Sequence, residues 1–180
     1  LAYRDHVDGR VLRILEDDPA RFGDRLDLLE LGLHHEQQHQ ELMLMDIKHV
    51  LSCNPLDPSF RSDPAPARND SAVQEWHRFG NGLHEIGHDG RGFAFDNEGP
   101  RHKVHVEDFA ISSRPITNRE LLAFVRDGGY AKPTLWLSDA WNQLETVERW
   151  TAPMYWEERD GEWFQFTLHG LEPLRLDDPA

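Results

Sequence analysis

The stretch Leu31–Val50, LGLHHEQQHQELMLMDIKHV, constrains this chain more than any other part of the sequence. Its apolar residues recur at intervals of three and four, which predicts an amphipathic helix from about Arg25 to Leu51. His35 and His39 are four residues apart, so their imidazoles lie on one helical face, one turn apart. Two imidazoles placed in this way are most of what one helix contributes to a mononuclear metal site. The sequence therefore predicts a metal site that includes His35 and His39.

The two histidines share the helical stripe that the leucines would bury. A polar group on a buried face is costly unless it has a partner, and metal ligation would satisfy both rings together. A shorter helix is predicted over 3–15, again with a single apolar stripe. Two packed helices share one apolar interface, which leaves the rest of each apolar stripe exposed to solvent. We therefore expect residues 1–53 to be the second half of a four-helix bundle whose other two helices precede Leu1.

Composition excludes several classes of partner. The chain has 180 residues and a formal charge of -14, which argues against nucleic acid, because phosphate binding needs clustered Lys and Arg. No apolar run approaches the roughly 20 residues of a membrane span, so we expect no membrane partner. The single cysteine, Cys53, excludes an internal disulfide and fits a reducing compartment. These features predict a cytoplasmic protein with Cys53 as a structural or incidental thiol.

The second half of the chain has a different pattern. Proline, serine and asparagine are frequent over 54–74, which predicts a linker between two domains. Short alternating segments follow within 75–180, and they predict strands at 76–79, 83–87 and 103–111. The predicted fold class is thus α+β, with two partial domains.

Two local signals refine this second domain. Thr117-Asn118-Arg119-Glu120 is a capping box, so a helix should follow through Val125 and end at Gly128-Gly129. Asp160-Gly161 separates two apolar segments and predicts a hairpin between 154–157 and 163–168. We expect Asp96–Pro100 to be a hydrogen-bonded turn rather than a cation site. Five tryptophans could form an aromatic wall for a quaternary ammonium ion, and most of them are expected to be structural instead: Trp136, Trp141, Trp150, Trp156 and Trp163.

Two metal chemistries compete for the histidine pair. Residues 35–39 spell H-E-x-x-H, in which Glu36 would activate a zinc-bound water. That class needs a third ligand, but its metzincin form would place Gly at Leu42 and His at Met45, and its gluzincin form needs a Glu where the proline-rich linker follows. The other interpretation is a three-His or two-His-plus-one site with open positions, which suits non-haem Fe(II).

Further ligands and supporting groups can be named for the iron site. The third ligand would come from another helix of the bundle, either His6 or, with more weight, a histidine before Leu1. His34 points about 100° away from the pair and is excluded as a ligand. Glu36, Gln38 and Glu41 are candidates for orienting the ligands. The alternative without a metal is a helix with two hydrogen-bonded core histidines.

The sequence also resembles a known family in two linked motifs. HHEQQHQEL, followed by MDIKHVLSCNPLDPSF, resembles the end of the DinB-like domain in ergothioneine-biosynthesis sulfoxide synthases. GNGLHEIGHDGRGFAFDNEGPRHKVHVEDFAISSRPITNRELLAFVRDGGY resembles the start of those enzymes' second domain, which is similar to the sulfatase-modifying, formylglycine-generating enzymes with a C-type-lectin-like fold. The resemblance covers nearly the whole chain.

This resemblance implies a specific reaction. Such enzymes use Fe(II) and O2 to join the sulfur of cysteine or γ-glutamylcysteine to C2 of hercynine, producing a sulfoxide. His35 and His39 would be iron ligands, and Gln38 would lie near the betaine substrate. The third histidine would fall upstream of Leu1 and an assisting Tyr beyond Ala180, so these 180 residues alone are expected to be inactive. An ovothiol-type or selenium-using relative, a zinc hydrolase and a non-catalytic binding module remain as alternatives.

Overall fold

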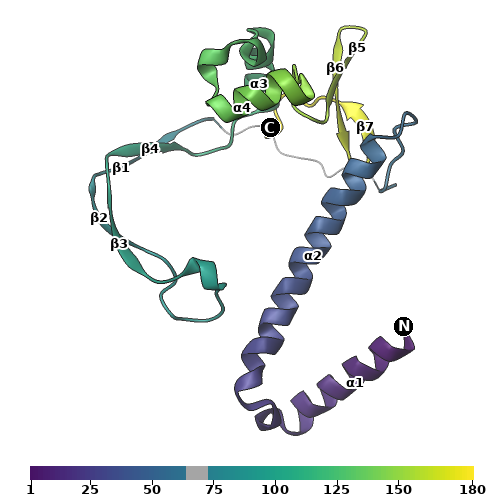
Figure 1. Ribbon diagram of the computed structural model, residues 1–180, viewed down its shortest axis with the longest axis vertical. Helices are drawn as coiled ribbons and strands as arrows, with labels where there is room; N and C mark the ends of the chain where they lie inside the picture. Colours follow the sequence, from purple (N-terminus) through teal and green to yellow (C-terminus); the bar gives the residue numbers. More distant parts are fainter. Residues whose placement is uncertain (64–72) are drawn as a thin grey trace. The chain divides into compact units, whose positions relative to one another are not determined.

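The computed structural model describes residues 1–63 and 73–180. The chain divides into two compact units: the first comprises Leu1–Met43 and Leu83–His105, and the second comprises Leu44–Gly82 and Val106–Ala180. Figure 1 labels the helices and strands along the chain. Helices and small sheets are mixed along the chain, which confirms the mixed α and β character predicted from the sequence. The DinB-like and lectin-like identities of the two halves stay predictions.

The first unit begins with two helices joined by a tight bend. Helix α1 is Ala2–Asp17, a 3-10 segment η1 is Pro19–Arg25, and helix α2 is Leu26–Ser52. Gly23 has a φ of 52°, a conformation that glycine adopts without steric cost, and it lets the chain turn into α2. The helices predicted over 3–15 and 25–51 are thus confirmed to within two residues.

No side chain of α1 or α2 is buried. Several apolar side chains of α2 are well exposed, among them Leu28, Leu33 and Met43. The described residues therefore do not form the predicted four-helix bundle, which stays a prediction. No helix in the described ranges has the length and hydrophobicity to cross a bilayer.

Strands β2 (Gly82–Ile86) and β3 (His102–Val106) form a two-stranded sheet that lies mostly in the first unit. Between them, residues 87–101 form a loop that contains the 3-10 turn η2 (Asp96–Glu98). Gly87 closes the base of this loop with a φ of 108°, and a Cβ there would lie 3.0 Å from the Pro100 carbonyl oxygen. Only glycine fits this close approach.

The second unit contains a two-stranded sheet of its own. Strand β1 (Trp76–Phe79) pairs antiparallel with β4 (Phe109–Ser112), with Phe79 opposite Phe109. The single strand predicted over 103–111 is therefore wrong, because the chain changes pairing partner at Glu107-Asp108. The Asp108 carboxylate accepts the backbone N–H of Asn81 at 2.5 Å and so holds the break between β1 and β2.

A helical layer follows, and its first helix has the predicted cap. Helix α3 is Asn118–Arg126, with Thr117 and Glu120 forming the capping box and Gly128 in the left-handed region at a φ of 72°. Leu122, a residue of this helix, has a buried side chain. The chain then continues through short helical segments: η3 (Gly129–Ala131), η4 (Pro133–Leu135), α4 (Ser138–Asn142) and the π-helical η5 (Gln143–Glu148).

A three-stranded antiparallel sheet completes the second unit. Its strands are β5 (Trp156–Arg159), β6 (Glu162–Thr167) and β7 (Gly170–Pro173). Asp160 and Gly161 have φ values of 52° and 83°, so both turn residues are left-handed, as a type I′ hairpin requires. The predicted hairpin is confirmed. All four apolar side chains that are buried among the described residues belong to this unit: Leu122, Leu144, Phe166 and Leu174.

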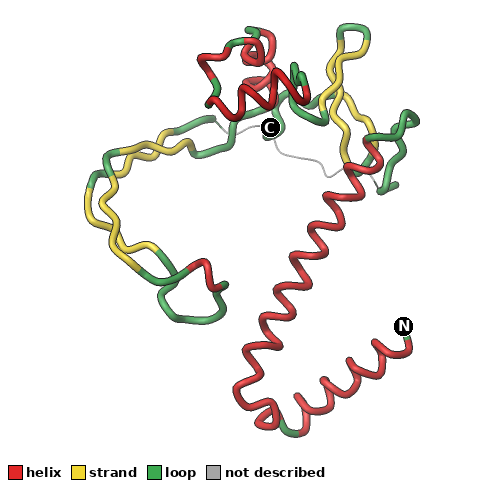
Figure 2. Tube along the Cα trace, in the orientation of Figure 1, coloured by secondary structure: helices red, strands yellow, loops and turns green. Residues whose placement is uncertain are grey.

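The described parts of the predicted linker, residues 54–63 and 73–74, contain no helix or strand (Figure 2). The first of these parts nevertheless lies against the sheet, since the backbone N–H groups of Phe60 and Arg61 both donate to the Leu168 carbonyl at 2.9 Å. An ion pair of 2.9 Å also joins Asp57 to Arg159 on β5. The rest of the predicted linker, 64–72, lies outside the described residues.

Candidate metal centre and neighbouring sites

Helix α2 brings His35 and His39 together on one exposed face. Their ring centroids are 4.5 Å apart with an interplanar angle of 79°. This spacing follows from the 3.6-residue period, and it suits two nitrogen donors to one divalent first-row metal ion. Within residues 1–63 and 73–180 there is no group of three or more His, Cys, Asp or Glu side chains that could hold a metal. The described residues thus fit two ligands of an iron or zinc site, and ligation by His35 and His39 stays a prediction.

The predicted supporting residues lie on the same helix. Glu36, Gln38 and Glu41 are all exposed, so their roles in orienting ligands or substrate stay predictions. His6, the weaker candidate for a third ligand, lines a hollow with Leu28 and Leu29 at the start of α2. That position is about two helical turns before His35, so the structure does not bring His6 to the pair.

His34 has contacts that sequence reasoning missed. It is half-buried, although its neighbours on α2 are exposed. Its ring stacks on Phe93 with centroids 4.0 Å apart and an interplanar angle of 20°, and Phe95 meets it edge-on at 6.4 Å. Phe93 and Phe95 also contact each other edge-to-face at 4.9 Å. The loop between β2 and β3 is therefore attached to α2 one residue before the first predicted ligand.

The Asp96–Pro100 segment is a hydrogen-bonded turn, as predicted. The Glu98 carboxylate accepts the backbone N–H of Phe95 at 2.7 Å, and the Glu98 carbonyl accepts that of His88 at 2.9 Å. Arg101 closes the loop by donating to Glu85 at 3.0 Å. These contacts give the loop that carries Phe93 an internal framework.

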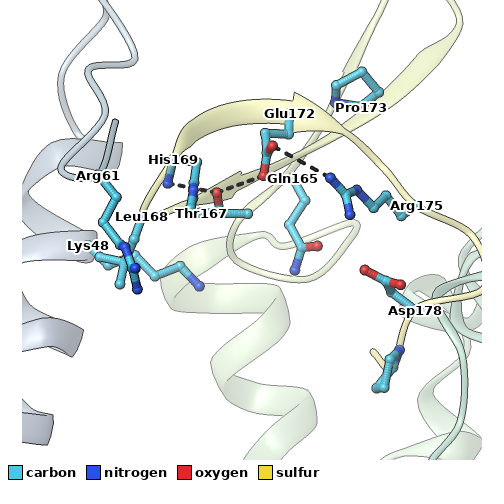
Figure 3. Close-up of a pocket in the computed structure, with 11 residues that line it drawn as sticks. Lys48, Arg61, Gln165, Thr167, Leu168, His169, Glu172, Pro173, Arg175 and Asp178 are labelled. Carbon is cyan, nitrogen blue, oxygen red and sulfur yellow. Dashed lines mark hydrogen bonds and ion pairs between the residues drawn. The ribbon is translucent and has the colours of Figure 1, made fainter. Parts of the chain in front are cut away.

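The second unit has a pocket of about 390 Å³ that sequence reasoning did not single out (Figure 3). Lys48 and Arg61 lie at one side of it, and Arg175 and Asp178 lie at the other. Two of its cations already have carboxylate neighbours: Arg61 pairs with Asp63 at 2.6 Å, and Arg175 lies 4.0 Å from Glu172. The charges of these two arginines are therefore compensated inside the protein.

The end of α2 belongs to the second unit and has aromatic contacts within it. The Lys48 ammonium lies 4.0 Å from the Tyr155 ring centroid, and burial lowers the pKa of Lys48. The Tyr155 hydroxyl lies 3.5 Å from Nδ1 of His49, and Sγ of Cys53 lies 3.9 Å from Nε2 of the same ring. This cluster anchors the helix about nine residues beyond His39, or roughly 13 Å along its axis.

Three of the predicted tryptophans have ring contacts, and these lie in two places. Trp136 contacts Phe124 and Tyr130, and its indole N–H donates to the Gly129 carbonyl at 2.9 Å. Trp156 and Trp163 meet across the β5–β6 hairpin with centroids 6.0 Å apart. These three side chains join neighbouring elements of the second unit, as expected of structural residues.

The sequence is similar to proteins of known families. Residues 64–174, more than half of the chain, match the sulfatase-modifying factor enzyme 1-like domain. A protein named hercynine oxygenase from Mycolicibacterium smegmatis is 32% identical over 144 residues, which are 78% of this chain and 31% of the relative. Its namesake from Mycolicibacterium thermoresistibile is 38% identical over 142 residues, 76% of this chain and 30% of the relative.

Two other relatives extend the comparison. The hercynine oxygenase of Mycobacterium tuberculosis is 28% identical over 148 residues, 82% of this chain and 34% of the relative. Ergothioneine biosynthesis protein 1 from Schizosaccharomyces pombe is 37% identical over 82 residues, 46% of this chain and 8% of the relative. The chain spans about a third of the length of the hercynine oxygenases that it matches.

Proposed function

This chain belongs to the sulfatase-modifying factor enzyme 1-like domain family, and we propose that it is part of a hercynine oxygenase of ergothioneine biosynthesis. The observation that carries the proposal is how far this similarity extends along the chain. A match of 148 residues in a chain of 180 must include residues 35–39 wherever it begins. The histidine pair and at least the first part of the domain that follows it thus fall within one stretch of similarity.

We propose that His35 and His39 hold a non-haem Fe(II) ion through neutral imidazole nitrogens. Their exposed position on α2 leaves the rest of the coordination sphere open for a third protein ligand and for substrates. When bound, the iron would supply the means to activate O2. Gln38 is adjacent to His39, and its amide would bind and orient the betaine substrate.

The proposed reaction joins a cysteine-type thiol to C2 of the hercynine imidazole. The thiol S–H and the C2–H bonds break, and a C–S bond forms. One oxygen atom of O2 becomes the sulfoxide oxygen, and the other leaves as water with the two hydrogens. O2 is the four-electron acceptor, so the step needs no external reductant. Cysteine and γ-glutamylcysteine are the two thiols proposed as substrates.

The test uses the full-length protein that carries this chain, purified without oxygen. We expect one Fe(II) per chain and oxygen uptake only when hercynine and a thiol are both present. The His35→Ala, His39→Ala double variant should lose the iron. The matched control is His77→Ala, an exposed histidine on β1, which should keep it. Stoichiometric zinc together with peptide hydrolysis would overturn the proposal in favour of the H-E-x-x-H interpretation.

A further inference from the structure

The stack of His34 on Phe93 joins the metal-binding stretch of α2 to a segment 59 residues further along the chain. Its centroid distance of 4.0 Å and interplanar angle of 20° describe two rings in face-to-face contact. Phe95 adds an edge contact to the same imidazole, so two aromatic rings of one loop enclose His34. Aromatic pairs of this kind contribute beyond the apolar area that they bury.

This contact matters because, among the residues that the structure describes, little else packs on α2 near the histidine pair. No residue of the helix is buried, and His35 and His39 are both exposed. The geometry of a two-ligand site is held more tightly when packing fixes the helical turn that carries the ligands. His34 is adjacent to His35, and the loop that contacts it has its own framework of hydrogen bonds from Glu98 and Arg101.

We propose that His34 is a positioning residue for the His35–His39 pair and that it acts through its stack on Phe93. This inference rests on the proposed function, since it takes the pair to be metal ligands. His34 holds the loop over 87–101 against the turn that begins the pair, and it thereby limits the rotation and fraying of α2 at that turn. Its own imidazole is turned about 100° away and takes no part in ligation.

The test is a titration of the apo protein with Co²⁺, followed by visible absorption. His34→Ala and Phe93→Ala should each weaken Co²⁺ binding by about tenfold, the lower end of what loss of a supporting residue costs. His34→Phe should bind Co²⁺ as the wild type does, because phenylalanine keeps a flat ring for the stack but cannot bind a metal. The His34→Ala, Phe93→Ala double variant should be no weaker than either single variant, because both remove one contact.

The matched control is Phe79→Ala, which removes the other stacked ring pair, Phe79–Phe109, with centroids 4.8 Å apart. It should leave Co²⁺ affinity unchanged. Unchanged affinity in His34→Ala, or a loss in His34→Phe as large as in His34→Ala, overturns the positioning role. Co²⁺ binding that survives in the His35→Ala, His39→Ala variant contradicts the metal assignment itself, which separates a failure of the proposed function from a failure of this inference.

Discussion

Glu120 combines a helix cap with an ion pair. Its carboxylate accepts the backbone N–H of Thr117 at 2.8 Å and two donors of the Arg114 guanidinium at 2.9 and 3.0 Å. The bonds from Arg114 and then the backbone of Thr117 lower the pKa of Glu120 from its ordinary 4.5 to about 2. The ionised carboxylate is therefore the form that the fold stabilises.

This lowered pKa predicts a defined pH window. A group with a depressed folded pKa contributes stability above its unfolded pKa and loses that contribution as pH falls through the folded value. Glu120→Gln should lower the thermal midpoint at pH 7, and the difference from wild type should shrink below pH 4.5 and vanish near pH 2. Circular dichroism melts at several pH values measure it.

The control for this variant is Glu158→Gln, which removes an exposed carboxylate on β5. It should leave the midpoint unchanged at every pH. A difference for Glu120→Gln that persists undiminished at pH 2 would mean that the charge of Glu120 is not the cause.

Chain separation decides which of these residue contacts could be predicted. Thr117 and Glu120 are three residues apart, and His35 and His39 are four apart, so helical geometry alone brings each pair together. The contact between His34 and Phe93 depends on where a distant loop packs, and no periodicity encodes that. The Phe-x-Phe pair between glycines was the one available signal in the sequence, and it does not indicate which residue the two rings contact.

At the scale of elements, the β5–β6 turn depends on two left-handed residues. Gly161 has a φ of 83° with open space around it, so a substitution there meets backbone strain rather than a clash. Gly161→Ala should destabilise the protein by about 1 kcal/mol, the cost of a left-handed residue with a Cβ. The thermal midpoint should fall by about 3 °C for a chain of this size.

The matched substitution is Asp160→Asn at the neighbouring turn position, where φ is 52°. Asparagine tolerates this conformation, so the midpoint should stay within about 1 °C of wild type, since such surface changes are small. An equal loss in both variants would contradict the argument from φ and point to a role for the Asp160 carboxylate.

The elements themselves were predicted with uneven success. The helices and the Asp160-Gly161 hairpin followed from local signals and are confirmed. The predicted strand over 103–111 failed because alternation indicates that a segment is extended but does not say where it changes partner. That change depends on the Asp108 carboxylate and Asn81, which are 27 residues apart.

At the scale of the whole molecule, the chain has a large negative net charge of -14. The chain has 33 Asp and Glu residues against 19 Lys and Arg, and most ion pairs within the described ranges are exposed. Excess charge of one sign repels itself in the compact state, and salt screens that repulsion.

The thermal midpoint should therefore rise when the NaCl concentration is increased about tenfold from a low starting value. The expected gain is about 3 °C for each kcal/mol of repulsion that is screened. KCl should give the same rise, because screening depends on ionic strength and not on the cation. A fall in the midpoint would mean that the exposed ion pairs stabilise the fold more than net repulsion opposes it.

The whole-molecule organisation was the least accessible to sequence reasoning. Composition and periodicity predicted the mixed fold class, but one compact unit combines Leu1–Met43 with Leu83–His105. Such a combination depends on contacts between distant segments, which local patterns do not specify. The predicted division at 53 and 75 stays a prediction.

Asn118, at the start of α3, illustrates what distant contacts mean for a growing chain. It is 1% exposed, and its backbone and side-chain N–H groups donate to the carbonyls of Asp178 and Arg175, both at 2.9 Å. On the ribosome these carbonyls emerge some 57 residues after Asn118, or at least about three seconds later at 5–20 residues per second. Until then only local contacts such as the capping box of Thr117 and Glu120 can stabilise the start of α3. The cap therefore stabilises this helix during synthesis, before its distant partners exist.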